Sequence, residues 1–344
     1  MTGAPNNAAI STRLPLLDGL RGIAALAVFV YHMVAQFGLS VPLGRSYLFV
    51  DFFFLLSGFV LGLAAEPRLT DWRRFMTSRV RRLWPVIALG AVLGGAAMLG
   101  QVPVGGLVMS TMLAMALVPA FWQSGVLYPL NTPHWSLLLE LLANLVHGLL
   151  LVRLKERTLW YLTAVSGVLL VAAIMVHGSN TSGVAAEGWL LGLPRVAFAY
   201  VLGVALARRY RAGSMPRFGG IAWLPALTLP LLFIAALDVF KIDDALGDIV
   251  VSVVLFPALF VLAIGATLPQ AFERSCAELG RISYPLYATH MPVLWLAGRL
   301  EDIIAPVTFS IIVAPALALV VANRLEPRAG AASSKGKTVQ AATA

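Results

Sequence analysis

The stretch LDGLRGIAALAVFVYHM, residues 17–33, has two charged residues among its first five and is almost wholly apolar after them. Arg21 is followed by ten residues of which only Tyr31 carries a polar group, and His32 comes next. At a rise of about 1.5 Å and a rotation of about 100° per residue, Arg21 and His32 lie about 16 Å apart on one face of a helix. A helix this apolar is buried in a protein core or in a membrane, so the composition of the chain decides between them.

The composition is that of a membrane protein. Of the 344 residues, 59% are hydrophobic and 12% are charged, whereas a soluble domain has about 25% charged residues. Several apolar runs reach the ~20 residues that cross a hydrocarbon core about 30 Å thick. The net charge of +9 lies mostly in short loops, where it orients the chain and attracts anionic lipid or a phosphorylated ligand, so we expect no nucleic-acid partner.

The sequence predicts an all-α polytopic fold with both termini in the cytoplasm. Every second loop is rich in arginine and the loops between them are acidic or neutral, which is the charge pattern of cytoplasmic and external loops. Ten apolar stretches are predicted to span the bilayer, at about 14–36, 47–65, 84–100, 134–153, 158–177, 188–208, 219–237, 246–268, 284–300 and 303–324.

A further apolar stretch, 104–122, does not fit this pattern, because an eleventh crossing would reverse every later loop. We interpret it as a re-entrant or non-crossing segment, and the alternative that it spans stays open. The predicted organisation is a cytoplasmic segment 1–13, a transmembrane domain 14–324 and a disordered tail 325–344 rich in Ala, Ser, Lys and Gly. The single cysteine, Cys276, excludes an internal disulfide and a cysteine-based zinc cluster.

Among the ionisable residues inside the predicted spans, five are singled out, because charge there is costly and therefore indicates function. They are His32, Asp51, Glu140, Arg195 and His290. Together they predict a polar cavity within the bilayer. A neutral imidazole can act as a general base near neutral pH, and Glu140 or Asp51 could orient the ring of His32; the sequence leaves the choice between them open.

The segment DWRRFMTSRVRRLWP, residues 71–85, holds five arginines and no lysine. Such a segment orients the chain, but the planar guanidinium also binds phosphate through paired hydrogen bonds. Arg79 and Arg82, three residues apart, share a helix face. We therefore predict that the segment also holds a phosphorylated ligand at the cytoplasmic surface.

Five stretches in order resemble the integral-membrane acyltransferase-3, or O-acetylase-like, family of bacteria. They are LDGLRGIAALAVFVYH with its arginine–ten residues–histidine spacing, VDFFFLLSGFVLG (50–62), RRFMTSRVRRLWP, HWSLLLELL (134–142) and GRISYPLYATHMP (280–292). The fourth stretch departs from the family pattern, since Glu140 is followed by two leucines in place of polar residues. Roles that the family gives to those polar neighbours do not carry over.

The resemblance implies an O-acyltransferase that moves an acyl group, usually acetyl, from acyl-CoA to a hydroxyl of a carbohydrate, glycolipid or other cell-surface or secreted acceptor. His32 would be the catalytic base, with a covalent acyl-histidine as the alternative, and Glu140 and Asp51 would assist. The donor would be bound by Arg21, Arg73, Arg74, Arg79 and Arg82. Other candidates for the cavity are Asp18, Tyr31, Ser57, Trp135, Ser136, Arg195, Ser283, Tyr284, Tyr287 and His290.

The alternative function is a polytopic transporter or exporter of a small or lipid-linked substrate, which would share the intramembrane charges. It would not need an arginine-rich phosphate site joined by one helix face to a buried histidine. We expect a multi-pass protein of the bacterial cytoplasmic membrane, with no tightly bound cofactor and no metal. The acceptor, the acyl chain length and the oligomeric state stay open.

Overall fold

The computed structural model describes residues 14–121 and 125–325. Within these ranges the chain forms helices and no strands; two isolated β-bridges join loop residues. The predicted segment 1–13 and the tail beyond Leu325 lie outside the described residues, while Leu325 itself ends the last helix. The α-helices are α1 (Pro15–Phe37), α2 (Phe49–Ala64), α3 (Trp72–Ala97), α4 (Val104–Met115), α5 (His134–Leu149), α6 (Glu156–His177), α7 (Gly192–Arg211), α8 (Trp223–Val239), α9 (Asp244–Ile249), α10 (Phe256–Gly265), α11 (Gln270–Arg299) and α12 (Pro306–Leu325), with a π-helical segment (Val250–Leu255) that joins α9 to α10 and short 3-10 turns at Ser46–Leu48, Glu66–Arg68, Leu151–Arg153 and Trp189–Leu191.

The helices in the described ranges are those of a multi-pass membrane protein. Eight of them, counted with their adjoining turns, are long and apolar enough to cross a bilayer. The two other predicted spans correspond to α8, which has 17 residues, and to the second half of α11, a 30-residue helix whose first half carries charged side chains. The total of ten crossings and the cytoplasmic position of both termini stay predictions.

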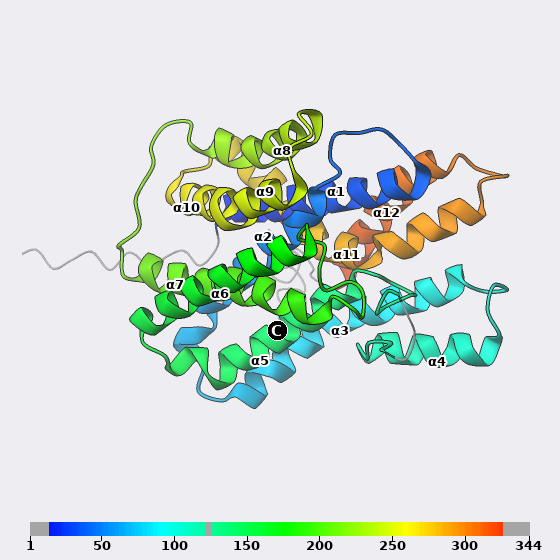
Figure 1. Ribbon diagram of the computed structural model, residues 1–344, viewed down its shortest axis with the longest axis horizontal. Helices are drawn as coiled ribbons and strands as arrows, with labels where there is room; N and C mark the ends of the chain where they lie inside the picture. The colour runs from blue at the N-terminus through cyan, green and yellow to red at the C-terminus, as the bar shows by residue number, and fades with distance from the viewer. Residues whose placement is uncertain (1–13, 122–124, 326–344) are drawn as a thin grey trace, which may run out of the picture.

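The stretch predicted not to cross contains the short helix α4. Its 12 residues are about 18 Å long at 1.5 Å per residue, well short of a 30 Å hydrocarbon core; residue 122 lies outside the described part. Helices α4 and α5 follow one another along α3 (Figure 1). Thr111 of α4 lies against Gly95 near the end of α3, and His134 at the start of α5 lies against Gly90.

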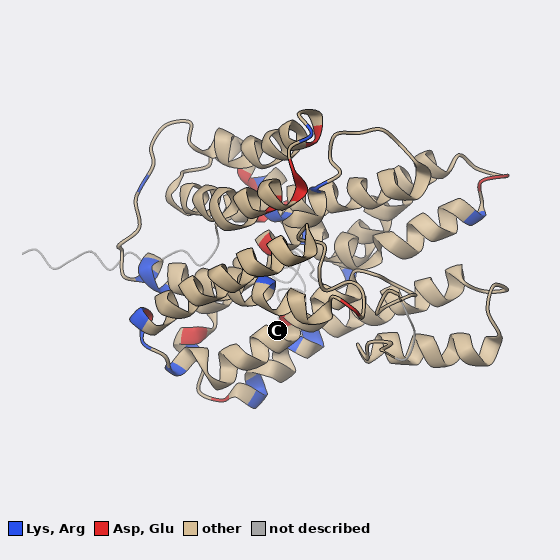
Figure 2. Cartoon of the chain, viewed as in Figure 1, with Lys and Arg blue, Asp and Glu red and all other residues tan. Residues whose placement is uncertain are grey.

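The connecting segments gather at two ends of the bundle. We call the end with loops 65–71, 150–155 and 212–222 the basic end, and the end with loops 38–48, 178–191, 240–243 and 300–305 the acidic end. In Figure 1 the loops of the basic end lie at the left, and Figure 2 shows most of the lysine and arginine ribbon there. The alternation of charge along the sequence therefore corresponds to a separation of charge in space.

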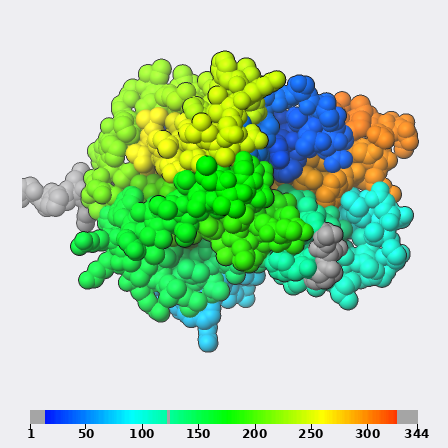
Figure 3. All heavy atoms as spheres, in the orientation of Figure 1, coloured from blue at the N-terminus to red at the C-terminus, as the bar shows by residue number. Residues whose placement is uncertain are grey.

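Glycine allows two helix pairs to pack very closely. A methyl group at Gly58 of α2 would lie 2.1 Å from the carbonyl oxygen of Tyr200, and one at Gly203 of α7 would lie 2.2 Å from that of Leu55. Helix α1 approaches α11 in the same way, since a methyl group at Gly22 would meet the backbone of Leu279 at 2.8 Å. Small residues at helix contacts are typical of membrane proteins. Most residues of helix α2 are buried, and Figure 3 shows the atoms of α6 to α10 on the face of the molecule turned toward the viewer.

Candidate functional site

A pocket opens between α1, α2, α3, α5 and α11, and we call it the arginine pocket because Arg21, Arg79 and Arg82 line it. Arg21 lies in the first half of α1, and Arg79 and Arg82 lie in the first half of α3, so the arginines line the part of the pocket nearer the basic end. Its volume is about 120 Å³. The other lining residues that the sequence singled out are Ser57, Ser136, Glu140, Ser283, Tyr284 and Tyr287. The structure thus brings nine predicted site residues from five helices to one pocket.

Glu140 lies in this pocket and pairs with an arginine. One of its carboxylate oxygens accepts a hydrogen bond from Ser57 Oγ at 2.8 Å and lies 3.5 Å from Nη2 of Arg79. Among the described residues Glu140 forms no hydrogen bond with His32. Its position therefore fits fixing of Arg79 rather than orientation of the histidine ring.

The predicted donor-binding arginines fall into two groups. Arg21 donates to the carbonyl oxygen of Gly280 at 2.7 Å and pairs with Asp18 at 3.2 Å, so its guanidinium is held at the pocket wall. Arg73 and Arg74 do not line the pocket; both are exposed, and Arg73 lies over the ring of Trp72 at 5.6 Å. Only Arg21, Arg79 and Arg82 are placed to contact a ligand in this pocket.

His32 and His290 form a contacting pair between α1 and α11. Nε2 of His290 lies 3.0 Å from Nδ1 of His32, and the same Nδ1 lies 3.0 Å from the carbonyl oxygen of Val28. Nδ1 of His290 lies 3.1 Å from the carbonyl oxygen of Leu286. Since Arg21 and His32 both contact α11, the prediction that they share one helix face is confirmed. His32 lies five residues before α1 ends at Phe37, nearer the acidic end than the middle of the helix.

The partners of the two rings assign their protons. A carbonyl oxygen can only accept, so Nδ1 of His290 carries a proton and its Nε2 is an acceptor. Nδ1 of His32 then donates to Val28 and to His290, which leaves Nε2 of His32 with an available lone pair. That nitrogen can take a proton, and the resulting positive charge is stabilised by the two acceptors at Nδ1. His290 therefore occupies the place that the sequence assigned to a carboxylate.

Asp51 belongs to a different, fully buried network. It pairs with Arg195 and accepts hydrogen bonds from Asn180 Nδ2 at 2.6 Å and Ser252 Oγ at 2.7 Å. Arg195 also stacks over the ring of Trp135 at 5.3 Å. Arg195 falls inside the predicted span 188–208, but residues 189–191 form a 3-10 turn, so α7 begins at Gly192 and Arg195 lies in its first turn. The ion pair joins α2 to α7, and the stacking of Arg195 on Trp135 adds α5.

The remaining candidates connect the arginine pocket to the histidines. Tyr287 forms a 2.6 Å hydrogen bond with Ser136 inside the pocket, and its ring centroid lies 6.0 Å from that of His290. Tyr284 donates to the carbonyl oxygen of Leu83 and Ser283 to that of Gly280, both at 2.7 Å. On the other side of the pair, Tyr31 packs edge-on against His32 at 4.9 Å.

Two residues of the Asp51 network were not predicted. Ser252 is a polar residue within the predicted span 246–268, and the π-helical segment that contains it directs it toward Asp51; π-helical turns are frequent at functional sites. A hydroxyl in so apolar a run was a signal that could have been used. Asn180 lies in a loop between α6 and α7, and no sequence pattern pointed to it.

The comparisons decide the class of protein. A family model described as an acyltransferase domain matches residues 14–322. The chain belongs to the acyltransferase-3 family. This membership confirms the resemblance and makes the protein an acyltransferase enzyme rather than a transporter.

Named relatives agree with this membership. The chain is 28% identical to acyltransferase MdmB of Streptomyces mycarofaciens, over 84% of this chain and 81% of that protein. It is 27% identical to the exopolysaccharide production protein ExoZ of Rhizobium meliloti (strain 1021), over 81% of this chain and 86% of that protein. A Staphylococcus aureus (strain COL) protein, provisionally named an O-acetyltransferase, is 36% identical over 25% of this chain and 14% of its own length. No solved structure matches the chain.

Proposed function

We propose that this acyltransferase moves an acyl group, in the first instance acetyl, from acyl-CoA to a hydroxyl of a carbohydrate or glycolipid of the cell envelope, with His32 as the general base. The observation that carries the proposal is the position of the histidine pair behind an arginine-lined pocket: Tyr287 lines that pocket and contacts His290, which contacts His32.

The arginine pocket suits the charged part of acyl-CoA. Arg21, Arg79 and Arg82 would bind its phosphates, because guanidinium groups pair with phosphate through parallel hydrogen bonds. Glu140 holds Arg79 and leaves the lining with net positive charge. The rise from Arg21 to His32, about 16 Å along a helix, suits a donor whose phosphates and reactive carbonyl lie at opposite ends of a long arm.

The chemistry at His32 balances as a direct transfer. Nε2 takes the proton of the acceptor hydroxyl while its oxygen attacks the thioester carbonyl carbon, so that a C–O bond forms. Collapse of the tetrahedral intermediate breaks the C–S bond, and the imidazolium returns its proton to the departing thiolate. The products are an ester and free CoA. The acceptor contacts at Nδ1 stabilise the imidazolium between the two steps, as Val28 and His290 are placed to do.

The membrane arrangement follows from the charge of the loops. We infer that the basic end faces the bacterial cytoplasm, where acyl-CoA is available, and that the chain crosses the cytoplasmic membrane ten times. The name of the Rhizobium relative refers to exopolysaccharide production, which supports a carbohydrate acceptor, and the Staphylococcus name refers to O-acetyl transfer, which supports acetyl.

Purified protein and radiolabelled acetyl-CoA test the proposal. We expect wild-type protein to release CoA and labelled acetate slowly in the absence of acceptor, and His32→Ala protein to release neither above background. Serine substitution of the buried Cys276 serves as the control for handling of the protein in detergent. Equal CoA release by wild type and His32→Ala would refute the base assignment, and no binding of acetyl-CoA by wild type would refute the donor.

A further inference from the structure

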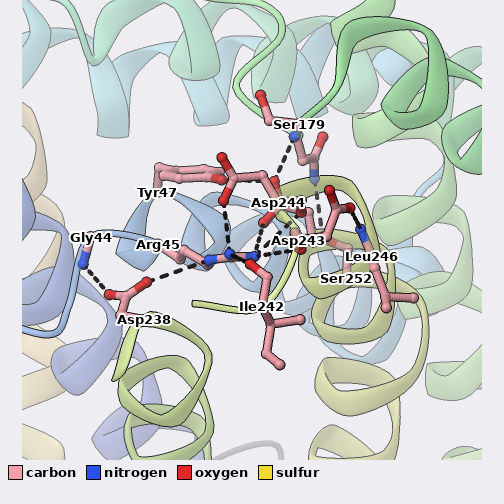
Figure 4. A network of polar contacts seen from close by, with 12 residues as sticks. Gly44, Arg45, Tyr47, Ser179, Asp238, Ile242, Asp243, Asp244, Leu246 and Ser252 are labelled. Atoms are coloured by element: carbon pink, nitrogen blue, oxygen red, sulfur yellow. Dashed lines mark hydrogen bonds and ion pairs between the residues drawn. The ribbon is translucent and has the colours of Figure 1, made fainter. Parts of the chain in front are cut away.

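A second pocket lies at the acidic end, on the opposite side of the histidine pair from the arginine pocket. It is formed where the α1–α2 loop, the end of α6 and the α8–α9 loop meet. Figure 4 shows its polar floor, in which Arg45 extends between Asp238 and Asp244 with Tyr47 and Ser179 nearby. The polar or charged lining residues are Ser40, Arg45, Tyr47, Ser179, Thr181, Asp238, Lys241 and Asp244.

The floor of this pocket is held in place by ion pairs and hydrogen bonds. Arg45 is only 5% exposed; its guanidinium lies 2.7 Å from Asp244 and 3.4 Å from Asp238, and it donates to the carbonyl oxygen of Ile242. Asp238 also accepts from the backbone N–H of Gly44 at 2.6 Å. The Gly44–Asp238 bond joins segments 194 residues apart in the sequence.

Two packed aromatic rings lie between this pocket and the base. Tyr47, in the pocket wall, packs edge-on against Tyr31 with ring centroids 5.7 Å apart, and Tyr31 packs against His32 at 4.9 Å. The hydroxyl of Tyr47 donates to Asp248 at 2.7 Å, which holds the ring in place. Two aromatic side chains therefore separate the second pocket from the base, while Tyr287 and His290 separate the arginine pocket from it.

The lining predicts the class of ligand. The arginine pocket has three cations, one carboxylate and five hydroxyls, whereas the second pocket has two cations, two carboxylates and four hydroxyls. The two pockets therefore differ in their balance of charge and not in their supply of hydroxyls. A balanced set of donors and acceptors beside a tyrosine ring suits a neutral molecule with many hydroxyl groups, since each hydroxyl both donates and accepts. It does not suit a polyanion such as the phosphates of CoA.

Lys241 is a second, independent sign of function here. Its φ of 50° is in the left-handed region, where a glycine would lie without strain. A lysine occupies this turn and lines the pocket, and its side chain forms no ion pair among the described residues. Strained positions of this kind cluster at ligand sites.

We propose that the second pocket binds the acyl acceptor as a polyhydroxylated molecule, a saccharide in chemical class, and presents one hydroxyl past Tyr47 and Tyr31 to Nε2 of His32. The proposal rests on the transferase function proposed above. Donor and acceptor then reach the base from opposite ends of the bundle, and the acyl group crosses between them.

The test blocks the second pocket with large side chains. Thr181→Trp and Ser40→Trp place an indole at exposed lining positions, and Gln101→Trp, exposed at the same end but not lining the pocket, is the matched control. Membranes of a deletion strain complemented with each variant receive radiolabelled acetyl-CoA, and labelled acetyl esters and labelled acetate are counted separately. We expect the ratio of ester to acetate to fall at least tenfold in the two lining variants, with the control at the wild-type ratio.

Lys241→Gly supplies a variant that should fold at least as well as wild type. We expect an unchanged or higher thermal midpoint together with a several-fold lower ester-to-acetate ratio, and recovery of the ratio in Lys241→Arg. Methyl α-D-glucopyranoside at high concentration should compete with the membrane acceptor for label, and n-decanol should not.

The outcomes separate the two proposals. A wild-type ester-to-acetate ratio in both lining tryptophan variants would overturn the acceptor pocket. Competition by decanol and not by the glucoside would overturn its ligand class. Absence of both labelled products from wild-type membranes would instead overturn the transferase function on which the pocket depends.

Discussion

The imidazole of His32 is oriented by neutral groups. Its Nδ1 contacts a backbone carbonyl and a second histidine, while Asp51 pairs with Arg195 and Glu140 with Arg79. A neutral partner places no fixed charge beside the reacting carbonyl, so the only charge that appears in the membrane interior during transfer is the one that the reaction itself creates. Each carboxylate is paired with an arginine, whose own charge needs an opposite charge nearby in the protein interior.

His32→Ala should lower the rate of acyl transfer by about 10²–10⁴-fold, because the general base is removed. The protein should still insert and accumulate, since His32 contributes a partly exposed ring rather than a core side chain. Transfer is measured with radiolabelled acetyl-CoA in membranes matched for protein by immunoblot. A variant that retains a tenth of the wild-type rate would contradict the assignment.

His290→Ala should lower kcat by about ten- to a hundredfold and leave both KM values nearly unchanged, because a hydrogen bond to a charged group contributes roughly 1.5–3 kcal/mol. His290→Gln, whose side-chain oxygen can still accept from His32, should recover part of the rate. Steady-state kinetics of the purified proteins separate kcat from KM. A rise in KM without a change in kcat would place His290 in substrate binding instead.

Arg79→Ala and Arg82→Ala should each raise the KM for acetyl-CoA by about tenfold or more, because each removes a charge-assisted bond to phosphate. Arg74→Ala is the matched control, since it removes the same charge from the same helix but lies outside the pocket. If the arginines only set the orientation of the chain in the membrane, the three substitutions should have the same effect on the KM for acetyl-CoA. Equal KM values in the three variants would therefore leave the segment a topology signal only.

At the scale of elements, the contact between α2 and α7 depends on glycine. Gly58→Ala places a methyl group 2.1 Å from the carbonyl oxygen of Tyr200, and relief of such overpacking typically costs about 1–3 kcal/mol. Gly105→Ala in α4 meets no atom within 4 Å and should be neutral. Thermal unfolding of both variants in detergent checks the difference. An unchanged midpoint for Gly58→Ala would show that the two helices can separate without loss of stability.

The sequence predicts relations within one helix better than contacts between helices. Helix geometry was sufficient to place Arg21 and His32 on one face, because both lie on one continuous helix. It could not pair His32 with His290, since periodicity describes one helix and not which helix lies beside it. The same limit applies to Asp51, whose partners Arg195, Asn180 and Ser252 come from three separate segments.

At the scale of the whole molecule, the two pockets require a defined topology. Between Gln101 and Thr181 lie α4, α5 and α6. If α4 does not cross the bilayer, both positions face the outside, so cysteines placed at them should both react with an impermeant maleimide in intact cells. Ser214→Cys, at the basic end, should react only after permeabilisation; the native Cys276 is buried. Labelling of Gln101→Cys and Thr181→Cys from opposite sides would mean that α4 crosses.

The contact between α1 and α11 also sets the order of events during biosynthesis. His32 leaves the ribosome early, whereas its partner is 258 residues further along the chain. At roughly 5–20 residues per second, the interval is on the order of 15–50 s. During that time α1 is in the bilayer without α11, so His32 lacks the contact with His290. A nascent or truncated chain therefore lacks the assembled histidine pair that would react with the thioester. The histidine pair can therefore form only after α11 has been synthesised, and the number of residues between the two histidines sets the minimum delay.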